Sequence, residues 1–148
     1  MLKPFFIFLF FLGITYGQTN VDKILNESWQ FSKKELFAQF KGKNLEEKET
    51  MGYSGYVMLD TLNSLIIDIG FFFNSDDIQK MRGVMNKNKS EKESKKLFEL
   101  LFSSINKLLG KAIADNEMMG ARMLQWKSKD HTIILNHSSD TCMLSILK

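Results

Sequence analysis

Apolar and polar positions follow two different periods along this chain, and the change of period separates helices from strands. From residue 90 to about residue 116, apolar side chains recur at helical spacing on one wide stripe. The stripe consists of Leu97, Phe98, Leu101, Phe102, Ile105, Leu108, Leu109, Ala112 and Ile113. Ser90 and Glu93 have the spacing of a capping box, in which each side chain bonds a free backbone N–H group. The pattern predicts one long helix over about residues 90–116.

A shorter helix is predicted nearer the start of the chain. Ser32 and Glu35 have the spacing of a second capping box, and Gly42 stands where a left-handed cap would end the helix. We therefore expect a helix over about residues 32–41. The preceding segment, VDKILNESW, also has its apolar residues close to helical spacing.

Six further segments have the composition of strands: YSGYVMLD, SLIIDIGFFFN, IQKMRGVMN, RMLQWKS, HTIILNH and CMLSILK. They are rich in β-branched and aromatic residues, and turn-forming residues separate them. In IQKMRGVMN, Lys80 and Arg82 share one face of the strand, while Met81, Gly83 and Met85 share the other. Such alternation is typical of a half-buried antiparallel strand.

The last two of these segments are expected to form a hairpin. Pairing Asn136 with Thr141 would place Leu135 opposite Cys142, with the apolar side chains of both strands on one side of the sheet. The charged segment KGKNLEEKETMG, by contrast, is interpreted as a connector. Together the elements predict an α+β fold, an antiparallel sheet of about five to six strands with the long and the short helix packed on it.

The start of the chain has the parts of a secretory signal peptide. A short positive segment precedes the apolar run Phe5–Ile14, and Thr15 and Gly17 suit the −3 and −1 positions of a cleavage site. The run is shorter than the roughly 20 apolar residues of a membrane span. We therefore expect a signal peptide at residues 1–17 and a single exported domain at residues 18–148, periplasmic or secreted. An uncleaved N-terminal membrane anchor is the alternative.

The number and distribution of charged residues argue against a nucleic-acid partner. The chain has 20 Lys and Arg against 17 Asp and Glu, a formal net charge of +3, and its arginines are Arg82 and Arg122 alone. Nucleic-acid binders more often gather arginines and aromatic residues on one face. Here the lysines are spread among glutamates, which is typical of a solvated surface. We expect no nucleic-acid partner, no membrane span once the leader is removed, and no cofactor.

Cys142 is the single cysteine, so an exported chain offers it no internal disulfide partner. His137 and Asp140 lie nearby in NHSSDTC, and a small hydrolase could use Cys142 as nucleophile with these two residues in support. Alternation along the strand instead directs Cys142 toward the core, where a free cysteine behaves as a small hydrophobe. The sequence favours the buried thiol, so a catalytic role of these three residues is the weaker hypothesis.

Metal binding is not predicted. His131 and His137 are the only histidines, and two imidazoles are fewer than the three or four protein ligands that zinc takes. The chain has no CxxC, HExxH or similar motif that would complete a set of ligands.

The segment GFFF and the nine methionines suggest an apolar surface or an apolar core. Phe71 and Phe73 point one way from their strand and Phe72 points the other way. Phe71, Phe73 and Trp126 are the candidate residues for a lipid or peptide held between the long helix and the sheet. A core role is favoured for them, because exposed apolar patches are the exception on folded proteins.

No catalytic template fits the chain, so the sequence favours a non-catalytic protein. The leading hypothesis is a binding or interaction module of the cell envelope or extracellular space, with an unidentified protein as its partner. A carrier for an apolar ligand and a small hydrolase using Cys142 and His137 are the alternatives.

Overall fold

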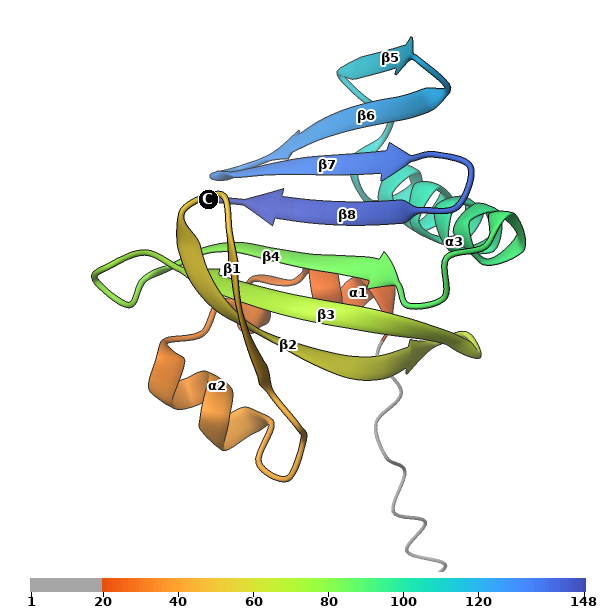
Figure 1. The fold of residues 1–148 in the computed structure, drawn as a ribbon. Helices are drawn as coiled ribbons and strands as arrows, with labels where there is room; N and C mark the ends of the chain where they lie inside the picture. Colours follow the sequence, from red (N-terminus) through yellow and green to blue (C-terminus); the bar gives the residue numbers. More distant parts are fainter. Residues whose placement is uncertain (1–19) are drawn as a thin grey trace, which may run out of the picture.

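A computed structural model describes residues 20–148, and the predicted signal peptide with its cleavage site before Gln18 lies outside the described residues. The fold is α+β, with one antiparallel sheet whose strands lie in the order β1-β2-β3-β4-β8-β7-β6-β5 (Figure 1). The helical segments are α1 (Val21–Leu25), the 3-10 helix η1 (Glu27–Trp29), α2 (Lys33–Gln39) and α3 (Glu91–Leu109). The strands are β1 (Glu46–Thr50), β2 (Tyr53–Leu62), β3 (Leu65–Phe73), β4 (Gln79–Asn86), β5 (Ala114–Met118), β6 (Ala121–Ser128), β7 (His131–His137) and β8 (Cys142–Leu147).

The general class and both main helices are confirmed, but the predicted number of strands was too low. The described sheet has eight strands. The two that were missed, β1 and β5, are its edge strands. The segment interpreted as a charged connector contains β1, whose side chains are almost all exposed. The predicted end of the long helix overlaps the start of β5, because α3 stops at Leu109 and Gly110 follows with a φ of 80°.

The fold consists of two halves with the same order of elements. Each half begins with helical structure and continues as a meander of four antiparallel strands. The last strands of the two halves, β4 and β8, pair antiparallel in the middle of the sheet. A two-residue Met-Gly turn with positive φ values joins the first two strands of each half, at Met51 and Gly52 and again at Met119 and Gly120. The strand order therefore reads the same from either edge of the sheet.

The helices cover one face of the sheet, and the hydrophobic core lies between them. In α3, Leu97, Leu101 and Ile105 have no exposed surface, and α3 packs against β7 and β8. Trp29 of η1 and Leu36 of α2 belong to the same core cluster. In both predicted capping boxes the serine hydrogen bond is present: the hydroxyl oxygens of Ser32 and Ser90 each accept a bond from the backbone N–H group three residues later. At Ser32 the reciprocal bond to Glu35 is also present.

Arg82 departs from the simple alternation of a half-solvated strand. The face of β4 that holds Arg82 carries the core, and only 2 % of Arg82 is exposed. The predicted sharing of this face with Lys80 is not supported, because the pairing with β3 shifts register there: Phe72 pairs with Met81 and Phe73 pairs with Gln79. Its Nε–H donates to the carbonyl oxygen of Ile24 at 2.8 Å, and its Nη2 donates to the carbonyl oxygens of Leu25 and Asn26 at 3.4 and 3.2 Å. The guanidinium thus satisfies the carbonyls of Ile24 and Leu25 at the end of α1, and it shares the Asn26 carbonyl with the Trp29 N–H.

The hairpin of β7 and β8 has a different register from the predicted one. Leu135 lies opposite Leu144, and His137 lies opposite Cys142. The four-residue turn consists of residues 138–141 instead of residues 137–140, because the Ser138 N–H and Oγ–H both donate to the carbonyl oxygen of Thr141. This is a shift of two positions, so every side chain keeps its predicted face.

The second face of the sheet has no helix on it and is called the open face below. Val57, Gly70, Gly83 and Ser145 form a row of directly paired residues on this face, across β2, β3, β4 and β8. The edge strand β1 crosses the open face in front of these central strands (Figure 1). Among residues 20–148, no helix has the length and apolar character that crossing a membrane would require.

Candidate binding groove

The hairpin of β7 and β8 brings His137 and Cys142 opposite each other but does not form a nucleophilic site. Cys142 has no exposed surface, and burial raises the pKa of its thiol to about 12. The His137 ring stacks on Phe98, with centroids 4.5 Å apart. The Asp140 carboxylate accepts a hydrogen bond from the Thr141 hydroxyl. A protonated thiol that faces the core lacks both the charge and the access of a nucleophile, so the geometry gives the hydrolase hypothesis no support.

The histidines are half-buried strand residues. Burial is the main reason that the pKa values of His131 and His137 lie below the ordinary value, and the positive charges of Arg82 and Arg122, respectively, lower them further. Within the part of the chain that the structure describes, no three His, Cys, Asp or Glu side chains come together as a metal site.

Phe71, Phe73 and Trp126, the candidates for an apolar ligand, all belong to the hydrophobic core. Phe71 has no exposed surface and contacts the rings of Trp29 and Phe40 at centroid distances of 5.6 and 5.5 Å. The space between α3 and the sheet is therefore filled by side chains of the protein itself.

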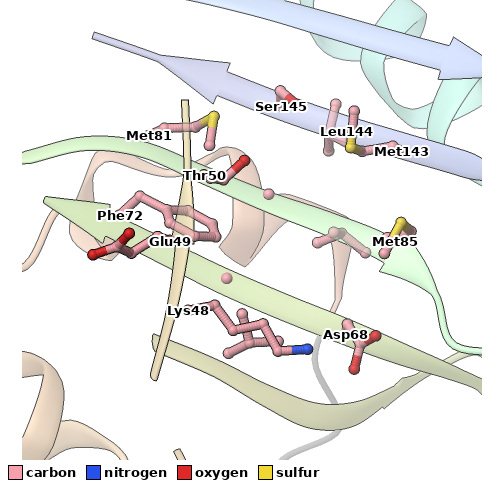
Figure 2. A pocket seen from close by; sticks show the side chains of 14 residues that line it. Lys48, Glu49, Thr50, Asp68, Phe72, Met81, Met85, Met143, Leu144 and Ser145 are labelled. Atoms are coloured by element: carbon pink, nitrogen blue, oxygen red, sulfur yellow. The ribbon is translucent and has the colours of Figure 1, made fainter. Parts of the chain in front are cut away.

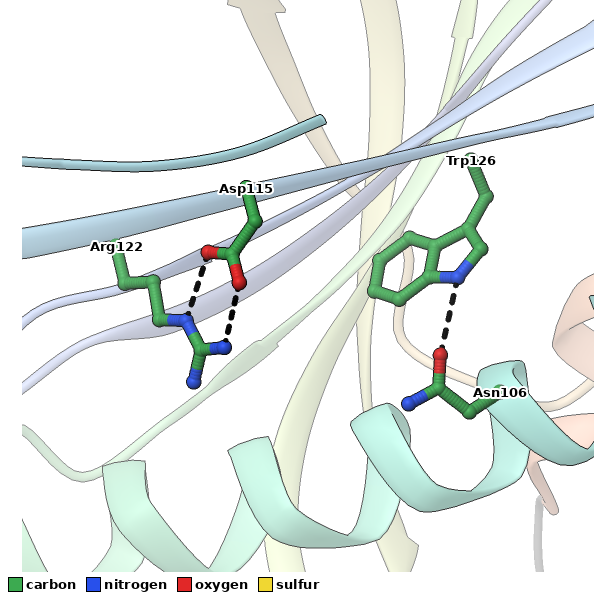
Figure 3. A network of polar contacts seen from close by, with 4 residues as sticks. All are labelled: Asn106, Asp115, Arg122 and Trp126. Carbon is green, nitrogen blue, oxygen red and sulfur yellow. Dashed lines mark hydrogen bonds and ion pairs between the residues drawn. The ribbon is translucent and has the colours of Figure 1, made fainter. Parts of the chain in front are cut away.

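Trp126 is held by polar contacts as well as by packing. Its indole N–H donates to Asn106 Oδ1 and to the Gly110 carbonyl oxygen, at 3.2 and 3.1 Å (Figure 3). Arg122 lies nearby and donates two parallel hydrogen bonds to the Asp115 carboxylate, which joins β6 to β5. The first contact holds the end of α3 to β6, and the second holds the edge strand β5 to β6. Both contacts are structural.

The open face carries a groove that the sequence did not point to. It lies between β1 and the central strands, and its volume is about 280 Å³. Apolar side chains form most of its lining, above all Phe72, Met81, Met85 and Met143 (Figure 2). Phe72 and Met81 are 9 % and 7 % exposed although they lie on the helix-free face, because β1 runs over them.

Glycines shape the floor of this groove. Gly70 lies directly opposite Gly83 across β3 and β4. A Cβ atom at Gly70 would lie 2.6 Å from Cε2 of Phe72, so the absence of a side chain lets the aromatic ring lie across the strand. A Cβ atom at Gly83 would lie 2.7 Å from the carbonyl oxygen of Leu144, so this glycine permits the close approach of β4 and β8.

The charged groups of the groove stand at its rim. Lys48 extends from β1 along the open face, on the side of Asp68 (Figure 2). Its ammonium group lies 3.6 Å from the Glu46 carboxylate, while Asp68 pairs with Lys87 at 3.5 Å. Glu49 directs its carboxylate away from the groove (Figure 2). An apolar floor with a charged rim is the usual composition of a binding site.

The sequence held two signals of this groove. A glycine inside a strand often marks the close approach of another group, and Gly70 and Gly83 are both inside strands. The shared face of Met81, Gly83 and Met85 was recognised from alternation. The position of β1 over that face could not be derived, because the β1 segment had not been identified as a strand.

Comparison of the chain with protein-family models, with curated proteins and with solved structures gave no match in any of the three.

Proposed function

We propose that this protein is exported, that its mature form begins at Gln18, and that it is a non-catalytic binding protein whose partner is another protein docked in the groove of the open face. The observation that carries the proposal is the groove itself. Its lining is built from Phe72, Met81, Met85 and Met143, side chains that would be expected in a core. Methionine-rich apolar surfaces adapt their shape to partners, because the methionine side chain is unbranched and polarisable.

Three exposed apolar side chains stand on the open face, one in the groove and two outside it. Leu59, Met123 and Met143 are 52 %, 39 % and 38 % exposed. By register they lie on the same face. Leu59 pairs with Asp68, which pairs with Met85, and Met85 pairs with Met143. Met143 in turn pairs with Asn136, which pairs with Met123. Asp68 and Asn136 interrupt this row. Exposed apolar side chains gathered on one face nevertheless support an interaction site there.

Site-specific photocrosslinking in the exporting host tests the proposal. Benzoylphenylalanine replaces Met143 in the groove and, as the matched control, the exposed Lys96 on α3. We expect a discrete adduct with one protein from Met143 and none from Lys96. Ser145→Trp, which fills the groove from its floor, should abolish the adduct. Equal labelling from both positions, or no adduct at Met143, would contradict the proposal.

A carrier of a small apolar molecule is the second candidate, because the same apolar groove has room for a short chain of methylene groups. Native mass spectrometry of the protein isolated from its host distinguishes the two. A bound mass of a few hundred daltons that Ser145→Trp removes supports the carrier; a ligand-free mass counts against it. N-terminal sequencing of the same sample tests export, since a start at Met1 would exclude cleavage before Gln18.

A further inference from the structure

This inference rests on the proposed function. The geometry points to a partner that binds through an extended polypeptide segment, which adds to the free edge of β1 as another strand. Its apolar side chains enter the groove, and its alternate side chains, which are basic, point away from it. Three independent features of β1 and its surroundings lead to this inference.

The first feature is a free hydrogen-bonding edge. β1 and β2 are joined by the two-residue turn at Met51 and Gly52, so the flanking Thr50 and Tyr53 form a hydrogen-bonded pair. Alternation along the ladder then directs the backbone groups of Lys48 and Glu46 to β2. The N–H and C=O groups of Glu47 and Glu49 point to the opposite edge, which has no strand beside it. Such an edge is a template for strand addition.

The second feature is the position of the groove along that edge. Lys48, Glu49 and Thr50 line one side of the groove, and Met81, Met85 and Met143 come from β4 and β8 on the other side. A strand beside β1 would therefore lie over the apolar floor. Its side chains alternate between the two faces, so every second one would enter the groove.

The third feature is the charge on the outer side of β1. Glu47 and Glu49 pair with Tyr56 and Ser54, so their carboxylates lie on the side away from the groove. The ion pair that β1 makes among the described residues is the one between Lys48 and Glu46, which leaves both of these carboxylates for a partner. Opposite charges on neighbouring strands attract, so outward positions of an added strand favour lysine or arginine.

The opposite edge of the sheet is less suited to this role. On β5 the Asp115 carboxylate already accepts two hydrogen bonds from Arg122. The Arg122 guanidinium also lies 5.7 and 5.5 Å from the ring centroids of Phe98 and Phe102. The acidic charge of Asp115 is thus engaged within the protein, whereas the carboxylates of Glu47 and Glu49 are not.

Fluorescence anisotropy with synthetic probes tests the inference on the purified protein. The probe is a fluorescein-labelled peptide of about seven residues, the length of an ordinary strand, in which lysine and leucine alternate. Two comparison peptides have the same lysines and leucines grouped in blocks, or glutamate in place of lysine. We expect the alternating lysine peptide to bind about tenfold more tightly than either comparison peptide. Equal binding of the alternating and block peptides would overturn the inference.

Backbone methylation separates strand addition from simple charge attraction. N-methyl groups at every second residue of the probe block either the amides that face β1 or those that face away from it. One of the two methylation patterns should abolish binding and the other should leave it unchanged. Equal loss with both patterns, or no loss with either, would contradict an added strand.

Variants of β1 provide the complementary test. Glu49→Pro removes an outward N–H group without affecting the ladder to β2, a position at which an edge strand tolerates proline. It should abolish probe binding, whereas Glu49→Gln should weaken it only partly. The double variant Glu47→Lys with Glu49→Lys should bind the glutamate peptide more tightly than the lysine peptide. Glu99→Lys on α3 is the matched control. Circular dichroism verifies that each variant folds.

The outcomes distinguish this inference from the proposed function. If photocrosslinks form at Met143 in the host but the alternating probe does not bind, the partner is not an added strand and the binding function stands. If the probe binds and Ser145→Trp leaves its affinity unchanged, the peptide does not use the groove and the inference is wrong.

Discussion

Arg82, in a central strand of the sheet, donates its Nε–H to the carbonyl oxygen of Ile24 near the end of α1, at a distance of 2.8 Å. Burial lowers the pKa of this guanidinium to about 10, so it stays protonated at neutral pH. The positive charge lies near the C-terminal end of α1, where the helix dipole favours a cation. One side chain therefore attaches the first helical segment to the centre of the sheet.

Replacing Arg82 should destabilise the protein strongly. Arg82→Met fills a similar volume but removes the side-chain donor of the Ile24 and Leu25 carbonyls, while Asn26 keeps the Trp29 N–H. We expect a loss of about 2–4 kcal/mol in the free energy of unfolding, because hydrogen bonds from charged groups are among the stronger ones. Urea denaturation followed by tryptophan fluorescence measures the loss. Lys80→Met, two positions earlier in β4, is the control and should cost far less.

The glycines of the groove floor should differ in how their replacement is tolerated. Gly70→Ala would press on the Phe72 ring, at a cost of about 1–3 kcal/mol. Phe72→Leu should relieve much of this cost, because it removes the ring atoms of Phe72 that the new Cβ atom would contact. Gly83→Ala is the control, since its Cβ would meet the Leu144 backbone, and Phe72→Leu should not relieve it. A double-mutant cycle by urea denaturation measures both couplings; equal couplings would contradict the packing described here.

Cys142 should be unreactive in the folded protein. Its thiol is buried and its pKa is raised to about 12, so the thiolate is scarce at neutral pH. Reaction with Ellman's reagent should be slow in buffer and fast in denaturant. Cys142→Ser should cost about 1–3 kcal/mol of stability, because it buries a hydroxyl group where the thiol packs. Binding in the groove should be unchanged, and rapid labelling of the native protein would contradict the core position of the thiol.

Stability should fall on mild acidification because of the histidines. The folded protein holds the pKa of His137 below its ordinary value of 6.5, mainly through burial. Below pH 6.5 the unfolded chain therefore binds a proton that the folded state resists, and the free energy of unfolding decreases as the pH falls toward the folded pKa. His131 acts in the same direction.

Urea midpoints at pH 7.5 and at pH 5.5 measure this dependence. His137→Gln with His131→Gln removes both titrating groups, so the difference between the two midpoints should shrink. An unchanged difference would contradict the assignment of this pH dependence to the two histidines. Asp115, whose pKa is lowered by the hydrogen bonds from Arg122, contributes only at more acidic pH, below its ordinary value of 3.8.

The elements that bury side chains were predictable from the sequence, and the edge strands were not. All six strands with apolar alternation were identified, since burial on one face imposes a period of two on the sequence. Strands β1 and β5 bury almost nothing, so selection for a core leaves no pattern in EEKET or ADNEM. One of these edge strands, β1, forms a side of the groove. The groove could therefore not be predicted from the sequence.

Arg82 illustrates a different limit. Alternation separated Arg82 from Met81 and Gly83, but a charged residue normally indicates the solvent side of a strand, whereas Arg82 lies on the core side. Its burial depends on carbonyl groups of α1, which are distant in sequence and carry no side-chain signal. The aromatic segment was the easier case, because Phe71 and Phe73 took the core side and Phe72 the opposite side, as the alternation requires.

The pairing of β4 with β8 gives the protein the character of a dimer within one chain. Each meander forms from neighbouring segments, whereas this seam joins strands far apart in the sequence and closes a long loop. The covalent connection keeps the two halves at a high effective concentration. Met85 and Met143 face each other across the seam, so the groove exists only after the halves have assembled. A segment bound there touches both halves, and its binding energy would add to the stability of the seam.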